Sequence, residues 1–335
     1  MAIRIALDFG SNYITIFNKG IGVVLKEPSI VIVSKFRRKL QLVATGSKAM
    51  KMLGKLDKDY NVVTPIVEGT ITNIDACSLM IEDYFRKVAD SNILRHRIEV
   101  LAAISCGLTV AERRDIETVL TRAGASQVTL IESPITIFQM GNKDNALIML
   151  IGGDITEVAI VSDDGIICGC SVDIAGEAFN TAITEYIAIK YRVQISTYTA
   201  EKVKTSIGSM YEKDMSTIEV NGKDLVENEP KSIEITASDI RKAIMPLLEK
   251  IVEVIDSVMC SCPENIIEEV YRNGIYLAGG SVQIAGLGDY FGERCKMTAS
   301  IISDPINAVA TGGGSLLEDA NSLNRILSIE KEEIK

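Results

Sequence analysis

The chain has 335 residues, of which 47% are apolar and 24% charged, a balance that argues against a disordered or fibrous protein. At ~150 residues per domain, this length suggests two domains. The net charge of −10 argues against a broad nucleic-acid surface, which is normally basic. No apolar run reaches the ~18 residues of a membrane-spanning helix, and the first residues enter a strand pattern without a signal-peptide layout. We therefore expect a cytoplasmic protein.

Cysteine and histidine usage limits the chemistry further. The seven cysteines lack a secreted-type framework and suit a reducing compartment. The pairs 168/170 and 260/262 have no histidine partner and no Cys-x-x-Cys spacing, so small core residues are favoured over a metal site. His96 is the single histidine, which argues against a Ser-His-Asp triad.

Short strands separated by glycine turns open the chain. Residues 3–7 are apolar and β-branched, residues 8–12 form a turn pattern, and residues 13–18 and 23–25 read as two more strands. Helical patterns come later in the same half. Thr109 and Glu112 have capping-box spacing in front of a helix that ends at Gly124.

The same order of strands and turns returns in the second half. Residues 146–151, 156–162 and 166–172 read as strands with turns at 152–154 and 163–165. Leu150 follows Asp8 by 142 positions (150 − 8), and Gly152 follows Gly10 by the same interval. This internal repeat predicts two similar α/β domains that face a shared cleft.

Further helices are expected downstream. Their apolar spacing predicts one around residues 179–186, a second from a Thr199 cap to Gly208, and a third that starts near Ser238 and contains Pro246. The charged tail, residues 330–335, is expected to fray.

Three glycine turns, at residues 8–12, 152–156 and 278–281, each follow an apolar strand. Glycine lets the backbone approach a phosphate, and exposed amides can bind the anion, so the set predicts a nucleotide site. The P-loop pattern and the dinucleotide fingerprint are both missing, which disfavours those two classes.

At these turns the sequence resembles the MreB family of bacterial actin homologues, within the superfamily of actin, heat-shock chaperones and sugar kinases. The similarity runs in order along nearly the whole chain. The residues that carry it are 7–12 (Leu-Asp-Phe-Gly-Ser-Asn), 22–29 (Gly-Val-Val-Leu-Lys-Glu-Pro-Ser), 111–114 (Ala-Glu-Arg-Arg), 123–125 (Ala-Gly-Ala), 130–134 (Leu-Ile-Glu-Ser-Pro), 152–159 (Gly-Gly-Asp-Ile-Thr-Glu-Val-Ala), 199–204 (Thr-Ala-Glu-Lys-Val-Lys), 207–209 (Ile-Gly-Ser), 277–280 (Leu-Ala-Gly-Gly) and 304–305 (Asp-Pro).

The resemblance implies an α/β actin-like ATPase fold with two related domains, or four subdomains, around a nucleotide cleft. Domain I would span 1–140 with an insertion near 31–72, and domain II would span 141–310 with an insertion near 179–239. Residues 311–335 would form a C-terminal helix and tail that return to domain I.

The resemblance also implies a site for ATP or ADP with Mg²⁺. Asp8 would hold Mg²⁺ through water, as suits a hard cation. The implied nucleotide contacts are a first phosphate loop (Gly10, Ser11, Asn12, Tyr13), a second phosphate loop (Gly152, Gly153, Asp154, Ile155), an adenosine-contacting pair on one helix face (Glu201, Lys204) and an adenosine loop (Gly279, Gly280, Ser281, Val282).

Two departures from the family pattern bear on hydrolysis. Leu150 stands where the family has an aspartate, and Ser133 stands where it has the acid that orients the attacking water. Asp154 and Ile155 replace a glycine and a threonine. Because water positioning is much of the catalysis at such sites, we expect weak hydrolysis. The alternative is that Glu132 or Asp154 compensates for the missing acids.

The resemblance also implies a cytoskeletal protein that polymerises head to tail, at the inner face of the cell membrane, for cell shape or for motility in wall-less cells. Its partners would be further copies of itself and paralogous subunits. Helix 110–123 would pair protofilaments side by side, or its charged outer face is a solvated surface. Ile93 and Leu94, followed by basic residues, could dip into a lipid surface, or could cover the core of their own domain. The competing functions are a degenerate paralogue that regulates a partner filament, a small-molecule kinase and a nucleotide-binding chaperone.

Overall fold

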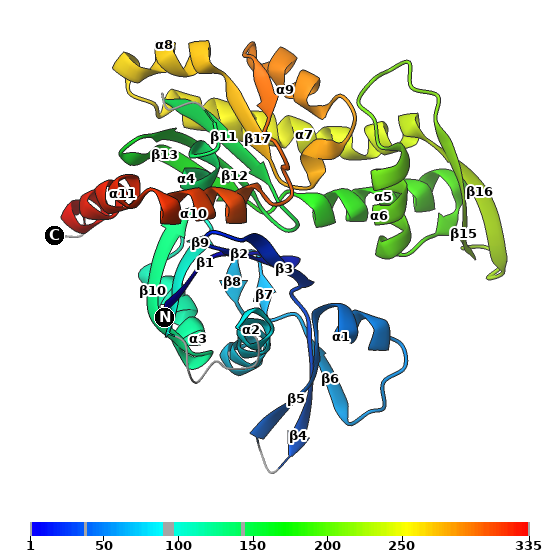
Figure 1. Ribbon diagram of the computed structural model, residues 1–335. Helices are drawn as coiled ribbons and strands as arrows, with labels where there is room; N and C mark the ends of the chain where they lie inside the picture. The colour runs from blue at the N-terminus through cyan, green and yellow to red at the C-terminus, as the bar shows by residue number, and fades with distance from the viewer. Residues whose placement is uncertain (1, 37–38, 90–96, 142–144, 334–335) are drawn as a thin grey trace.

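The computed structural model describes residues 2–36, 39–89, 97–141 and 145–333. Two five-stranded sheets dominate it, one in each half of the chain (Figure 1). The first has the order β10-β9-β1-β2-β3 and the second β13-β12-β11-β17-β18. Their strands are β1 Ala2–Phe9, β2 Tyr13–Asn18, β3 Gly22–Pro28, β9 Arg97–Ile104, β10 Ala125–Glu132, β11 Ala146–Ile151, β12 Thr156–Ser162, β13 Gly165–Val172, β17 Ile275–Ala278 and β18 Ala299–Ile301.

The two sheets repeat one pattern of strand pairing. β1 is antiparallel to β2 and parallel to β9, and β11 is antiparallel to β12 and parallel to β17. The pairs Asp8↔Thr15 and Leu150↔Glu157 hold the same place in the two hairpins. Both pairs keep the interval of 142 residues (150 − 8 and 157 − 15), so the repeat seen in the sequence is a repeat of structure.

Smaller sheets and helices extend from each large sheet. Between β3 and β9 lie the sheet β5-β4-β6 and the hairpin β7-β8, and between β13 and β17 lies the sheet β14-β15-β16. Their bounds are β4 Val31–Phe36, β5 Lys39–Thr45, β6 Tyr60–Val63, β7 Ile66–Val67, β8 Thr70–Ile71, β14 Val193–Gln194, β15 Thr217–Asp224 and β16 Pro230–Thr236. Figure 1 shows β4–β6 and β15 reaching away from the two large sheets. The proposed domain and insertion boundaries stay a prediction.

The helices pack around and between the sheets. They are α1 Gly46–Met52, α2 Ile74–Val88, α3 Val110–Arg122, α4 Ser133–Phe138, α5 Gly176–Tyr191, α6 Thr197–Ile207, α7 Ala237–Cys260, α8 Glu264–Asn273, α9 Leu287–Cys295, α10 Ala308–Glu318 and α11 Ala320–Glu333, with a short 3₁₀ turn, η2, at Ser281–Gln283. The capping box expected at α3 is present, with Thr109 and Glu112 bonded reciprocally. The cap expected for α6 is wrong, because Ser196 caps the helix and accepts from the Thr199 amide.

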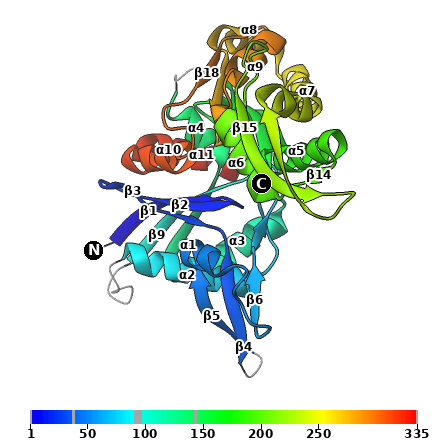
Figure 2. The ribbon, with the colours of Figure 1, turned by 90° about the vertical axis from the view of Figure 1, so that its right-hand side faces the viewer.

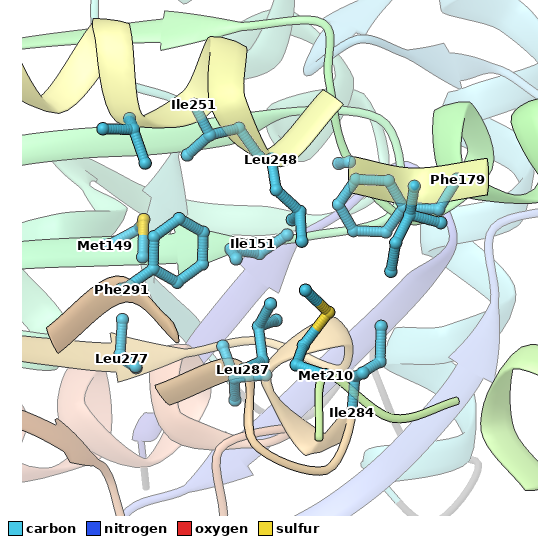
Figure 3. Packing of buried hydrophobic residues seen from close by; sticks show 14 of the residues in the cluster. Met149, Ile151, Phe179, Met210, Leu248, Ile251, Leu277, Ile284, Leu287 and Phe291 are labelled. Atoms are coloured by element: carbon cyan, nitrogen blue, oxygen red, sulfur yellow. The ribbon is translucent and has the colours of Figure 1, made fainter. Parts of the chain in front are cut away.

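Separate cores lie on the outer faces of the sheets and between the halves. In the second half, Met149 of β11, Leu277 of β17 and Phe291 of α9 point toward one another (Figure 3). A third cluster joins Ala103 and Ile131 of the first sheet to Ile148 of the second, with α4 and α10 between them. Figures 1 and 2 both show α10 between the halves.

The C-terminal segment contacts both halves. α10 packs on the first sheet, where Gly313 lies against Ala6 and Gly314 against the Phe17 ring. α11 turns to the second half, where Arg325 binds Asp164 at 2.6 Å. The segment therefore does not simply return to the first half, and α11 continues helically to Glu333 where a frayed tail was expected. In the described residues no helix is long and apolar enough to span a bilayer.

Candidate nucleotide site

The first predicted phosphate loop lies between β1 and β2 and is held by its own hairpin and by β3. Ser29 donates to the Gly10 carbonyl at 2.6 Å, and the Ser29 amide donates to the Asn12 carbonyl at 2.9 Å. Gly10 faces the Tyr13 carbonyl so closely that a methyl group there would overlap it. These contacts hold the loop in a tight turn at the end of β1.

The second predicted phosphate loop, between β11 and β12, faces the first. A methyl group on Gly153 would overlap the Asn12 side chain, so the two loops are in near contact. The Gly176 and Glu177 amides at the start of α5 donate to the Gly152 and Gly153 carbonyls, at 3.2 and 2.8 Å. The repeat therefore brings equivalent turns of the two halves face to face.

The predicted adenosine residues lie behind the second loop. Gly279 has φ +96° and packs against the Ile151 carbonyl, while its amide donates to the Pro305 carbonyl at 2.8 Å. Lys204 is buried and donates to the Gly176 carbonyl at 2.9 Å, and it pairs with the half-exposed Glu201 at 2.6 Å. The structure thus gathers residues from α5, α6 and β17.

Three of the four residues of the predicted adenosine loop are buried, Gly279 among them. Ser281 is 7% exposed and lies beside Gly176, and Val282 is 1% exposed and belongs to the core of the second half. Gly280 is exposed. Gly280 is therefore the accessible residue of this loop.

Asp8 lies at the end of β1 beneath the first loop. Desolvation raises the pKa of its carboxyl to about 7, and the Lys26 ammonium opposes that shift. Such a carboxyl carries only part of its charge near neutral pH until a cation arrives. Among the described residues, no group of three metal-ligating side chains surrounds it.

Three candidate catalytic residues already have partners. The Ser133 hydroxyl, 5% exposed, donates to the Ile104 carbonyl at 2.9 Å. Glu132 binds Arg113 at 2.6 Å. Asp154 Oδ2 accepts from the Glu68 amide, 3.2 Å away in the β7–β8 turn. Ile155 packs against the same turn, near Gly69.

Sequence reasoning missed Glu157, which is the direct cross-strand neighbour of Leu150. Its side chain is 2% exposed, and its Oε1 accepts from the Cys106 amide at 2.6 Å. Burial raises its pKa to about 8, and Glu132 and Asp8 add to the shift by charge repulsion. A glutamate inside an otherwise apolar strand was the signal available. The carboxyl absent at Leu150 is thus present one strand away.

The predicted lipid-contacting residues, Ile93 and Leu94, lie outside the described residues.

Comparison with known proteins defines the class first. The fold is the actin-like α/β fold: the structure superposes on MreB5 of Spiroplasma citri bound to ADP with a TM-score of 0.86, at 29% identity, covering 97% of this chain and 98% of that chain. The AMPPNP-bound form of that protein gives 0.87 at the same identity and coverage. A MamK double helical filament gives 0.80 at 15% identity, over 95% of this chain and 99% of MamK, which supports the fold alone.

The chain belongs to the MreB/Mbl family. The family model described as MreB/Mbl protein matches residues 2–325. The cell shape-determining protein MreB of Pasteurella multocida is 31% identical over 324 residues, 94% of this chain and 92% of that protein. The chain is therefore a member of an actin-like cytoskeletal family.

Proposed function

We propose that this chain binds ATP and ADP between its first phosphate loop, its second phosphate loop and the loop at Gly279 and Gly280. The observation that carries the proposal is that a structure of 29% identity and matching fold over 97% of the chain was solved with ADP and with AMPPNP. Convergence of the three glycine loops supports it. Calorimetric titration of ADP and ATP tests it, and the absence of any binding would refute it.

Mg²⁺ fits this site as an ion held chiefly by phosphates and water. Mg²⁺ keeps several waters and needs only one or two carboxylates, and Asp8 supplies one of them. Leu150 supplies no oxygen, so the ion would rely on Asp8 and on the nucleotide. When bound, Mg²⁺ neutralises phosphate charge. Asp8 would hold the ion through one of its waters, and a bound cation would favour the charged form of its carboxyl, whose pKa burial raises to about 7.

We propose that hydrolysis is slow. Glu132 and Asp154 are engaged by Arg113 and by the Glu68 amide, and Ser133 has no charge and donates to a carbonyl. Each acid thus has one oxygen committed to a protein partner, Glu132 Oε1 and Asp154 Oδ2, which restricts how it can orient a water molecule. Phosphate release at the rate of an acid-bearing MreB under matched conditions would refute slow hydrolysis. Ser133→Glu should raise the rate, whereas Ser133→Gln, similar in size but uncharged, should not.

Nucleotide binding would serve polymerisation into cytoskeletal filaments for cell shape or motility. ATP would close the two halves and favour head-to-tail contacts, which generate open filaments because they do not close on themselves. Sedimentation and negative-stain imaging with ATP, ADP and no nucleotide test this. ATP-promoted filaments support it. Persistent monomers that bind nucleotide would instead favour a regulator of a paralogous filament, for which the engaged acids are the specific observation.

Membrane association at the inner face of the cell membrane is proposed from sequence alone. Ile93 and Leu94 next to basic residues have the composition of a lipid-contacting loop. Co-sedimentation with anionic liposomes should be lost in the double variant Ile93→Ser/Leu94→Ser. Unchanged co-sedimentation of that variant would reject this loop as the contact.

A further inference from the structure

A row of three polar side chains crosses the first sheet beneath the first phosphate loop. Thr15 of β2 lies opposite Asp8 of β1 and opposite Lys26 of β3. Residues directly opposite each other in neighbouring strands project from the same face of a sheet. Asp8, Thr15 and Lys26 therefore share one face, the face on which Ala6 meets α10.

Thr15 is the first sign that this row holds a ligand. It is 1% exposed, and its hydroxyl has no hydrogen-bond partner among the described residues. Leaving a buried hydroxyl without a partner costs about 1–3 kcal/mol, so native proteins rarely do so without a reason. The neighbour on one side is the carboxyl that the predicted site uses, and the neighbour on the other side is an ammonium.

Lys26 is the second sign. Its Nζ donates to Asn307 Oδ1 at 3.0 Å and lies 5.6 Å from the centre of the Tyr13 ring, at the end of the first phosphate loop. An ammonium has three donors, and within the described residues this is its only hydrogen bond. Burial lowers its pKa, against the attraction of Asp8 and Asp304. Two donors thus remain for an acceptor from outside the protein.

The charges select the kind of ligand. A metal ion at Thr15 would face the Lys26 ammonium, which disfavours it. An anion rich in oxygen atoms would accept from the Lys26 ammonium and from the Thr15 hydroxyl, as charge-assisted bonds to phosphate do. The first phosphate loop, directly above, is also predicted to bind phosphate.

We propose that Lys26 and Thr15 are phosphate-binding residues, which contact the diphosphate of the nucleotide from the floor of the first loop. The inference rests on the proposed nucleotide binding and adds two residues to it. Lys26 supplies a fixed positive charge in a site that lacks one carboxylate for Mg²⁺ at Leu150. The Lys26 ammonium would thereby neutralise part of the negative charge of the phosphate groups.

The test titrates ADP, with Mg²⁺ present, into the full chain and three variants. Lys26→Met keeps the aliphatic stem and should weaken ADP binding about tenfold or more, the loss expected for one charge-assisted contact. Lys19→Met is the matched control: Lys19 lies on the same hairpin and donates to the Leu317 carbonyl at the far end of α10. It should bind ADP as the parent does.

Thr15→Val separates a ligand contact from a structural role. Removing an unpartnered buried hydroxyl should leave the unfolding temperature of the nucleotide-free protein unchanged or higher. ADP binding should nevertheless weaken about threefold or more, the loss of one hydrogen bond. If Thr15 only supported the fold, the unfolding temperature and the ADP affinity would fall together.

The outcomes discriminate between the two proposals. If the parent chain binds ADP and both Lys26→Met and Thr15→Val bind it equally well, the inference is refuted while nucleotide binding stands. A fall in ADP affinity matched by an equal fall in Lys19→Met would also overturn it. If the parent chain binds neither ADP nor ATP, the proposed function is refuted and this inference with it.

Discussion

Glu157→Gln should make the stability of the nucleotide-free protein less dependent on pH. Glu157 is 2% exposed, and burial raises its pKa from 4.5 to about 8. A carboxyl whose pKa is raised on folding binds its proton more tightly in the folded state. Its stabilising contribution is therefore complete below the unfolded pKa and is lost as pH rises through the folded pKa.

The magnitude follows from the size of that shift. At about 1.4 kcal/mol for each unit of pKa, a rise from 4.5 to about 8 corresponds to at most about 5 kcal/mol lost on ionisation. The loss spreads over the window between those two values. Asp8, whose pKa is raised to about 7, adds a loss of the same sign that the variant keeps.

Urea unfolding at about pH 5 and about pH 9 measures the effect. Glutamine keeps an oxygen that can accept from the Cys106 amide but cannot ionise. The parent chain should lose several kcal/mol between the two conditions, and Glu157→Gln should lose clearly less. Glu185→Gln, an exposed position on α5, should behave as the parent does. Equal losses in the parent and Glu157→Gln would show that Glu157 does not ionise in this window, and the reasoning from burial would fail.

Three further predictions concern the loop at Gly279, the Asp154 contact and one helix cap. Gly279→Ala should lower the free energy of unfolding by about 2–4 kcal/mol, because φ is +96° and a methyl group would overlap the Ile151 carbonyl. Gly280→Ala, with open space around it, should lower it by under about 1 kcal/mol. Urea unfolding measures both. Asp154→Gly should speed hydrogen exchange of the Glu68 amide about fivefold, and Asp154→Asn, which keeps an acceptor, should speed it less; equal rates in all three proteins would contradict a real contact. Thr109→Ala should cost about 1 kcal/mol through loss of the capping box, and an unchanged unfolding midpoint would contradict it.

Local patterns predicted the elements well where local physics decides them. Strand β2 matches its expected bounds, because alternation and flanking turns act within a few residues. The predicted cap of α6 was wrong, although a helix cap is also a local feature. Ser196 and Thr199 are both good caps, and their order along the chain does not say which amide meets which hydroxyl.

Contacts between distant elements could not be predicted from the sequence. Nothing in the motif at residues 152–157 says that Asp154 would meet the Glu68 amide, and nothing in the motif at 130–134 says that Glu132 would meet Arg113, since those partners come from other elements. The turn of α11 toward Asp164 is of the same kind. Register also had to come from the structure, because the pairing of Leu150 with Glu157 depends on how β11 and β12 align.

The internal repeat allows equivalent positions of the two halves to be compared at the site. Asp8 and Leu150 are equivalent positions, and so are Thr15 and Glu157. In the first half the acid is on the first strand and the hydroxyl on the second; in the second half the first strand is apolar and the second carries the acid. Glu157 therefore keeps a carboxyl at this edge of the core between the halves, but its raised pKa leaves it largely neutral near pH 7. A neutral acid avoids repelling phosphate groups, and it is a poor substitute for a charged metal ligand. The proposed nucleotide binding and the proposed slow hydrolysis are therefore both compatible with a leucine at position 150.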